Sequence, residues 1–144
     1  MFQDRPTLEE KLKAAENYRS ENIKIYDFIS RMDLAYKAAD VVISRAGAGT
    51  ISELCLLEKA SILVPSPNVA EDHQTKNAMA LVKKDAALIV KDSETEEKLI
   101  PEALRLLNET DEIKTLSENI SKGKMIDSDE LIAKEVLRLI DLNK

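Results

Sequence analysis

The feature that most constrains the fold is a regular alternation between two hydrophobic periodicities. Short runs of branched apolar residues, typical of buried strands, occur at 23–26, 41–44, 61–64 and 86–90. Segments with helical spacing lie between them at 30–39, 50–57 and 72–82, the first of which Ser30 could cap. Strands that alternate with helices are joined by crossovers, so an α/β fold is predicted, with a parallel sheet covered by helices on both faces.

The pattern changes in the last third of the chain, 91–144, where helical spacing continues without strand-type runs. One apolar helix face is marked by Ile113, Leu116 and Ile120, and another by Ile132, Val136, Leu139 and Ile140. Pro101 fits only a first helical turn or a kink, which leaves the helix boundary near Leu99 open. We therefore expect an α/β core at about 23–90 and a helical tail packed on it.

Composition excludes several classes of function. The 27 acidic and 21 basic residues give a net charge of −6, which argues against nucleic acid as a partner and against anchoring to an anionic membrane. One cysteine and one histidine allow no internal disulfide and are too few for a structural zinc site, so no metal or cofactor is predicted. No apolar run approaches the roughly 18 residues of a membrane span, and the N-terminus lacks a signal-peptide pattern, so a cytoplasmic location is expected.

The first segment that could carry chemistry is 45–53, with the sequence RAGAGTISE, directly after the predicted strand 41–44. Ligands of open α/β sheets bind outside the carboxyl ends of the strands. Gly47 and Gly49 let a ligand approach the backbone closely, and the free N–H groups of a helix start favour anions. The spacing is not that of the dinucleotide fingerprint, and Gly-x-Gly alone is unspecific.

Glu53 has two possible roles in this segment. Thr50 and Glu53 have the spacing of a capping box, in which Glu53 would bond the backbone of the first helical turn. Its two carboxylate oxygens also match a pair of ligand hydroxyls, such as those of a ribose. Spacing alone favours the capping role and leaves the ligand role open.

The second segment is 65–77, which follows the strand 61–64 and so lies at the same edge of the sheet. Its polar side chains are Glu71, Asp72, His73, Gln74 and Asn77. Amide groups donate and accept hydrogen bonds, which suits sugar hydroxyls, although a solvated first helical turn explains the cluster equally well. His73 could act as a general base, but a surface histidine is the commoner case.

Two further features have plainer explanations. Cys55 is interpreted as a buried structural thiol, because no histidine lies near it in sequence. The acidic run 92–97 is interpreted as a solvated helix start rather than a metal site.

Together the two segments resemble the C-terminal, donor-binding domain of the MurG glycosyltransferases. The resemblance runs from about residue 25 to residue 90 and is carried by YDFI at 26–29, ADVVISRAGAGTISE at 39–53 and EDHQTKNA at 71–78. It implies a Rossmann-like domain that forms half of a GT-B glycosyltransferase. The whole enzyme would move N-acetylglucosamine from UDP-N-acetylglucosamine to lipid I and so make lipid II for peptidoglycan.

The resemblance also implies a set of binding residues. Ile29 and Met32 would border the uracil, Glu53 would hold the ribose hydroxyls, and Gln74 would contact the sugar. For Glu53 this makes ligand binding the favoured role and capping a secondary one. No catalytic residue is assigned within the chain. The predicted site is Ile29, Met32, Arg45, Gly47, Ala48, Gly49, Thr50, Ile51, Ser52, Glu53, His73, Gln74 and Asn77.

Two parts of the family pattern have no counterpart in these 144 residues. One is the N-terminal acceptor domain, which carries the expected general base and the surface facing lipid I and the membrane. The other is a glycine- and serine-rich loop that helps hold the diphosphate. We therefore expect a fragment that is inactive alone and belongs to a peripheral protein of the cytoplasmic membrane face.

Three alternatives stay open from the sequence. One is a separate donor-binding subunit that works with a membrane partner. Another is a UDP-sugar epimerase, although the chain offers too few acid–base residues for a catalytic epimerase. The last is a non-enzymatic module that binds a nucleotide sugar.

Overall fold

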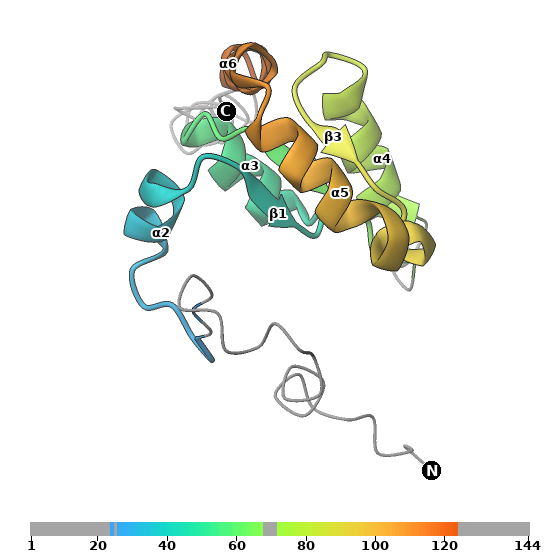
Figure 1. The fold of residues 1–144 in the computed structure, drawn as a ribbon, viewed down its shortest axis with the longest axis horizontal. Coiled ribbons are helices and arrows are strands. Elements are labelled where there is room, and N and C mark those ends of the chain that lie inside the picture. The colour runs from blue at the N-terminus through green and yellow to red at the C-terminus, as the bar shows by residue number, and fades with distance from the viewer. Residues whose placement is uncertain (1–23, 25, 68–71, 124–144) are drawn as a thin grey trace, which may run out of the picture. The chain divides into compact units, whose positions relative to one another are not determined.

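The structure is a computed structural model that describes residues 24, 26–67 and 72–123 (Figure 1). The chain divides into two compact units, Met1–Met32 and Asp33–Lys144. The predicted strand 23–26 lies partly outside the described residues, and its described members, Lys24 and Tyr26, are not in a strand. The predicted helix face at 132–140 also lies outside the described residues.

The sheet of the second unit has three strands, β1 (Val42–Ser44), β2 (Ser61–Leu63) and β3 (Leu88–Ile89). Their order is β1-β2-β3 and both pairs are parallel. In the register, Ile43 lies opposite Ile62, and Leu63 lies opposite Ile89. Each strand falls inside its predicted range, so the parallel sheet predicted from the sequence is confirmed.

Helices cover both faces of this sheet, as predicted. The helical elements in the described part of the chain are α2 (Met32–Ala38), α3 (Ala48–Leu56), α4 (His73–Val82), the 3₁₀ turn η2 (Asp92–Glu94), α5 (Thr95–Leu107) and α6 (Thr110–Ser121). Because both crossovers step in the same direction across the sheet, right-handed connections place α3 and α4 on one face. In Figure 1, α5 crosses the other face.

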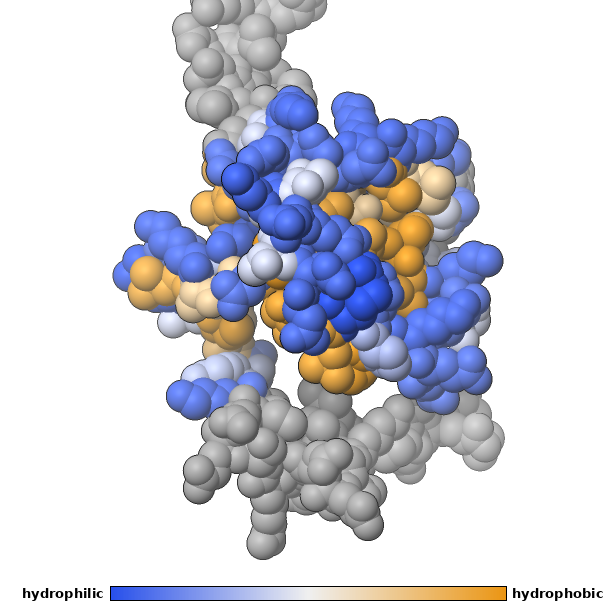
Figure 2. Space-filling model, turned by 45° about the horizontal axis from the view of Figure 1, so that its top comes forward, coloured by the Kyte–Doolittle hydropathy of each residue, from blue (hydrophilic) through white to orange (hydrophobic). Residues whose placement is uncertain are grey.

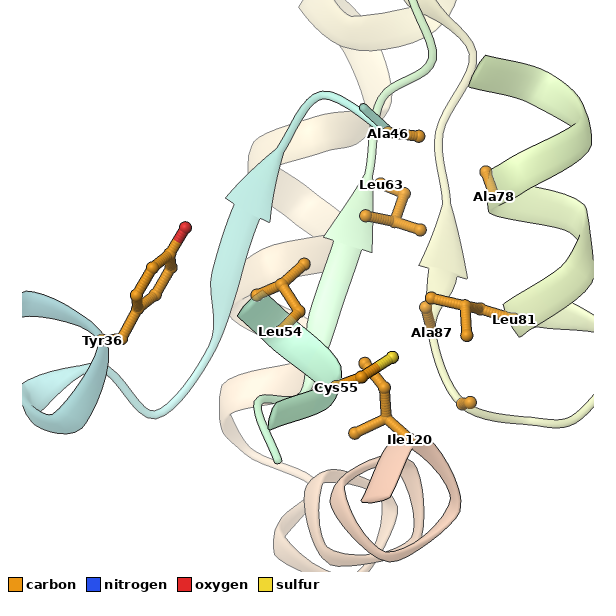
Figure 3. Close-up of a cluster of buried hydrophobic side chains, with 10 residues drawn as sticks. Tyr36, Ala46, Leu54, Cys55, Leu63, Ala78, Leu81, Ala87 and Ile120 are labelled. Atoms are coloured by element: carbon orange, nitrogen blue, oxygen red, sulfur yellow. The ribbon is translucent and has the colours of Figure 1, made fainter. Parts of the chain in front are cut away.

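The core consists of two clusters separated by the sheet, because successive side chains of a strand point to opposite faces. Leu63 packs with the buried residues of α3 and α4, as Figure 3 shows. Ile62 packs with Leu106, the buried residue of α5. The predicted apolar face of α6 serves both clusters, since Leu116 belongs to the second and Ile120 to the first. Cys55 is buried in the first cluster, which confirms its structural interpretation.

Three helix boundaries differ from the prediction. α2 begins at Met32, so Ser30 does not occupy the capping position directly before it. α3 begins at Ala48, two residues before the predicted start. Pro101 lies in the interior of α5, so no boundary exists near Leu99. Proline removes one backbone donor, and the carbonyl that this donor would have served belongs to Glu97, an exposed residue that water can reach.

On the face shown in Figure 2, hydrophobic side chains are visible between polar ones. Within the part of the chain that the structure describes, no helix is long and apolar enough to cross a membrane.

An ion pair that joins α5 to α6 gives a testable pH dependence. Arg105 donates to both carboxylate oxygens of Glu112, at 2.6 and 3.0 Å, and holds the pKa of Glu112 below its usual range. A lowered pKa in the folded state contributes stability above the usual glutamate value of about 4.3, and that stability is lost as the pH falls. We expect Glu112→Gln to lower the melting temperature at about pH 7 and much less at about pH 3.

The matched control is Glu109→Gln, which alters an exposed glutamate in the turn between the same two helices. Melting curves of both variants across this pH range provide the measurement. An equal effect of Glu112→Gln at both pH values would contradict the prediction.

Candidate functional site

The turn after β1 leads directly into the N-terminus of α3. Gly47 is the N-cap residue, with an extended backbone, φ −68° and ψ 148°, and its carbonyl accepts the first helical bond from Ile51 N–H at 2.9 Å. The N–H groups of Ala48, Gly49 and Thr50 precede that bond and so have no acceptor within the helix. Gly47 has no side chain that could cap them. The helix start therefore presents donors and a positive partial charge at the carboxyl end of β1.

The fold does not require glycine at either position of this turn. Neither Gly47 nor Gly49 has a positive φ. A Cβ atom added at Gly49 would meet nothing within 4 Å, and one at Gly47 would come no closer than 3.9 Å to Thr50 Oγ1. The glycines instead keep the space over the first turn of α3 open, which suits the close approach of a ligand.

The capping box predicted from Thr50 and Glu53 is wrong. Because α3 begins at Ala48, Thr50 is the third helical residue and Glu53 lies in the second turn, beyond reach of the N-cap. The carboxylate of Glu53 accepts a hydrogen bond from the hydroxyl of Tyr36, with 3.1 Å between Oε2 and the phenolic oxygen. Glu53 is exposed, so it remains accessible to a ligand.

Tyr36 is a residue of α2 that the sequence did not single out. It is buried, and its pKa is raised first by that burial and then by the hydrogen bond and charge of Glu53. The phenol therefore stays protonated at neutral pH and remains a donor to the carboxylate.

Arg45 links the carboxyl ends of all three strands. Its Nη1 atom donates to the carbonyls of Val64 and Pro65, at 3.3 and 3.4 Å, and forms an ion pair with Asp92. Val64 and Pro65 follow β2, and Asp92 follows β3. Arg45 was predicted as part of the site. Its positive charge is already paired with Asp92 and bonded to backbone carbonyls.

Two predicted residues of α4 hold the neighbouring loops. Asn77 Nδ2 donates to the carbonyl of Ala46 at 3.2 Å, which ties α4 to the β1–α3 turn. Gln74 Oε1 accepts a bond from the N–H of Ser66 at 2.9 Å, which ties α4 to the loop after β2. Each amide also carries a second polar atom able to bond a ligand. His73 is exposed at the first position of α4.

The predicted site residues are distributed over the two compact units of the chain. Ile29 and Met32 are exposed and belong to the first unit, and all the others belong to the second. On α3, Ser52 is exposed and its Oγ donates to the carbonyl of Ala48 at 3.0 Å. Thr50 and Ile51 are half-buried. The β1–α3 turn, α3 and the start of α4 thus converge on one edge of the sheet.

A cavity of about 550 Å³ also opens at the carboxyl ends of β2 and β3. None of the predicted site residues lines it. Its lining is mostly apolar and contains three acidic residues against one lysine, which disfavours an anion. The lining residues are Pro65, Pro67, Asp72, Thr75, Met79, Ile89, Lys91, Asp92, Ser93 and Glu94. The start of α3 is therefore the better place for an anionic ligand.

Comparison with known proteins identifies the family. The model of the glycosyltransferase family 28 C-terminal domain matches residues 2–134. The chain belongs to this family.

Two curated relatives of this family 28 domain share the name UDP-N-acetylglucosamine--N-acetylmuramyl-(pentapeptide) pyrophosphoryl-undecaprenol N-acetylglucosamine transferase. The protein from Bacteroides fragilis is 60% identical over 118 residues, covering 82% of this chain and 31% of that protein. The protein from Bacteroides thetaiotaomicron is 54% identical over 136 residues, covering 94% of this chain and 36% of that protein. The chain spans about a third of the length of the curated relatives it matches.

A solved structure agrees with these relatives. The crystal structure of Acinetobacter baumannii MurG superposes with a TM-score of 0.73 at 26% identity, covering 90% of this chain and 40% of that one. The resemblance to MurG and the parallel α/β fold, predicted as half of a GT-B enzyme, are thereby confirmed.

Proposed function

We propose that this family 28 domain binds UDP-N-acetylglucosamine as the donor part of a glycosyltransferase. The enzyme would transfer N-acetylglucosamine to lipid I, the undecaprenyl-linked muramyl pentapeptide named in its relatives, and so make lipid II at the cytoplasmic membrane face. The observation that carries the proposal is the uncapped start of α3, with open space over Gly49 and with Glu53 in the next turn.

The diphosphate of the donor would lie over the first turn of α3. Transfer breaks the bond between the anomeric carbon of the sugar and the β-phosphate oxygen, and the leaving UDP gains negative charge. The backbone N–H groups of Ala48, Gly49 and Thr50 point toward this position, and the helix dipole favours the charge that develops there.

The ribose and the sugar would be held farther along the same edge. Glu53 lies five residues after the start of α3, about 7.5 Å along the helix axis, which leaves room for the ribose between the diphosphate and the carboxylate. Its carboxylate would accept bonds from the ribose hydroxyls, while Gln74 and Asn77 would offer amide groups to the sugar. The base that activates lipid I is proposed to come from outside this chain.

Glu53→Gln tests the proposal. The amide keeps the shape of the side chain but loses the charge that strengthens bonds to hydroxyls, and such bonds contribute about 1.5–3 kcal/mol each. UDP affinity is expected to fall about ten- to a hundredfold. NMR titration of the purified chain with UDP provides the measurement, because it detects weak binding.

The melting temperature of Glu53→Gln is expected to change little, since Glu53 does not cap α3 and Tyr36 can still donate to the amide oxygen. The matched control is Glu97→Gln, which alters an exposed glutamate in the first turn of α5. Unchanged UDP affinity in Glu53→Gln would refute the assigned role of Glu53.

A further inference from the structure

The hydroxyl of Tyr36 is held in place by the core. Tyr36 is only 7% exposed and belongs to the same buried cluster as Leu54, the neighbour of Glu53 in α3. Figure 3 shows its ring extending from α2 beside β1, with the hydroxyl directed toward the end to which the β1 arrow points. That end is the edge of the sheet at which the candidate site lies. Packing fixes the position of the hydroxyl oxygen, because the core holds the whole side chain in one rotamer.

Glu53, in contrast, is an exposed glutamate with several rotatable bonds. Ordering such a side chain on ligand binding costs conformational entropy, of the order of 1 kcal/mol. The 3.1 Å hydrogen bond from Tyr36 to Oε2 restrains the carboxylate before any ligand arrives. A carboxylate offers about four acceptor positions on its two oxygens, and Tyr36 occupies one of them. Enough acceptor capacity remains for two hydroxyl groups.

We propose that Tyr36 is a positioning residue that orients the Glu53 carboxylate toward the ribose hydroxyls and so contributes to the selection of ribonucleotides over deoxyribonucleotides. The inference rests on the proposed function, in which Glu53 holds those hydroxyls. Tyr36 itself does not contact the ligand. It acts by keeping one carboxylate oxygen engaged and the other directed outward.

A purely structural role for the same hydrogen bond predicts a different result. If the bond only fastened α2 to α3, its loss would lower the melting temperature and would affect all ligands of the site equally. An orienting role instead predicts a larger effect on ligands that carry both ribose hydroxyls. The ratio of affinities for UDP and 2′-deoxy-UDP therefore separates the two roles.

Tyr36→Phe in the complete chain is the direct test, since it keeps the packed ring and removes only the donor. UDP affinity is expected to fall about three- to tenfold, because a net hydrogen bond is worth about 0.5–1.5 kcal/mol. The affinity for 2′-deoxy-UDP is expected to fall less, so the preference for UDP shrinks. In a Glu53→Ala background, Tyr36→Phe should have no further effect on UDP affinity, because coupled residues are not additive.

The outcomes distinguish the two proposals. Unchanged UDP affinity in Glu53→Ala would refute both the proposed role of Glu53 and the inference about Tyr36. A clear loss in Glu53→Ala with an unchanged UDP preference in Tyr36→Phe would overturn only the role of Tyr36. An unchanged preference means equal losses for both nucleotides, which is the result expected of a purely structural bond.

A second measurement needs no substitution. In the unaltered chain, UDP is expected to shift the NMR signals of the Tyr36 ring. The Tyr36 hydroxyl donates to the Glu53 carboxylate, and ligand hydroxyls bound to that carboxylate withdraw electron density from it. The shift at saturation should be smaller with 2′-deoxy-UDP. Identical Tyr36 shifts with both nucleotides would contradict the inference even if Tyr36→Phe did not fold.

Discussion

Leu106→Ala is expected to lower the free energy of unfolding by about 2–5 kcal/mol. Leu106 is completely buried and lies in one cluster with Ile62 of β2, with Val64 directly after that strand, and with Leu116 of α6. Truncation removes buried methyl groups and leaves a cavity that the rigidly packed neighbours cannot fill. Since small domains are stable by only about 5–15 kcal/mol, the variant should unfold at a much lower urea concentration.

Leu104→Ala is the matched control for this prediction. Leu104 lies on the same helix two residues away, but it is 57% exposed. The same substitution there should change the free energy of unfolding by no more than about 0.5 kcal/mol. Urea unfolding of both variants provides the measurement. Similar losses at both positions would show that the packing of α5 on the sheet is not what stabilises the domain.

The layout of the fold was predictable because each strand is a dense apolar run in a chain that is otherwise helical in pattern. Residues 61–64 are buried throughout, so this central strand is apolar on both faces and stands out in the sequence. Strands β1 and β3 flank it and are partly exposed, yet their branched residues sufficed to locate them. The alternation of strands with helices then required parallel pairing.

The start of α3 could not be predicted from capping rules. Its N-cap is Gly47, which has no side chain to mark the position, while Thr50 and Glu53 happen to have the spacing of a capping box inside the helix. A comparable difficulty arises where helices end. Glu58 and Asp85 adopt left-handed backbones after α3 and α4, with φ of 54° and 50°, in positions where glycine is the usual signal.

The arrangement of the candidate site residues was predictable where neighbours in sequence determine it, and not where it depends on tertiary contacts. The position of Glu53 behind a glycine turn at the end of a strand is a local pattern that the sequence displays. The bond from Tyr36 to Glu53 spans 17 residues, and the pair of Arg45 with Asp92 spans 47. Only the packed sheet brings these groups together, so the orientation of Glu53 and the engagement of Arg45 emerged from the structure.

Gly49→Val is expected to abolish most UDP binding without destabilising the domain. Gly49 is the second residue of α3, its φ is not positive, and a Cβ atom there would meet nothing within 4 Å. The fold can therefore accept a side chain, and because glycine is among the poorest helix formers, the melting temperature should stay constant or rise.

The branched side chain of Gly49→Val would occupy the open space over the first helical turn. The diphosphate would lose its bonds to at least two backbone N–H groups there, at about 1.5–3 kcal/mol each, so UDP affinity should fall at least about a hundredfold.

Gly49→Val is informative because it should lower UDP affinity without lowering the melting temperature. A damaged fold would lower both. Gly49→Ala should lie between the native chain and Gly49→Val in UDP affinity, and it should not melt earlier than the native chain. Glu96→Val is the matched control, since it places the same side chain at the second position of another helix, α5, away from the turn after β1. NMR titration with UDP and thermal melting of the three variants provide the measurements. If Gly49→Val binds UDP as tightly as the native chain does, the diphosphate does not lie over the start of α3. The glycines of this turn would then need an explanation other than ligand access.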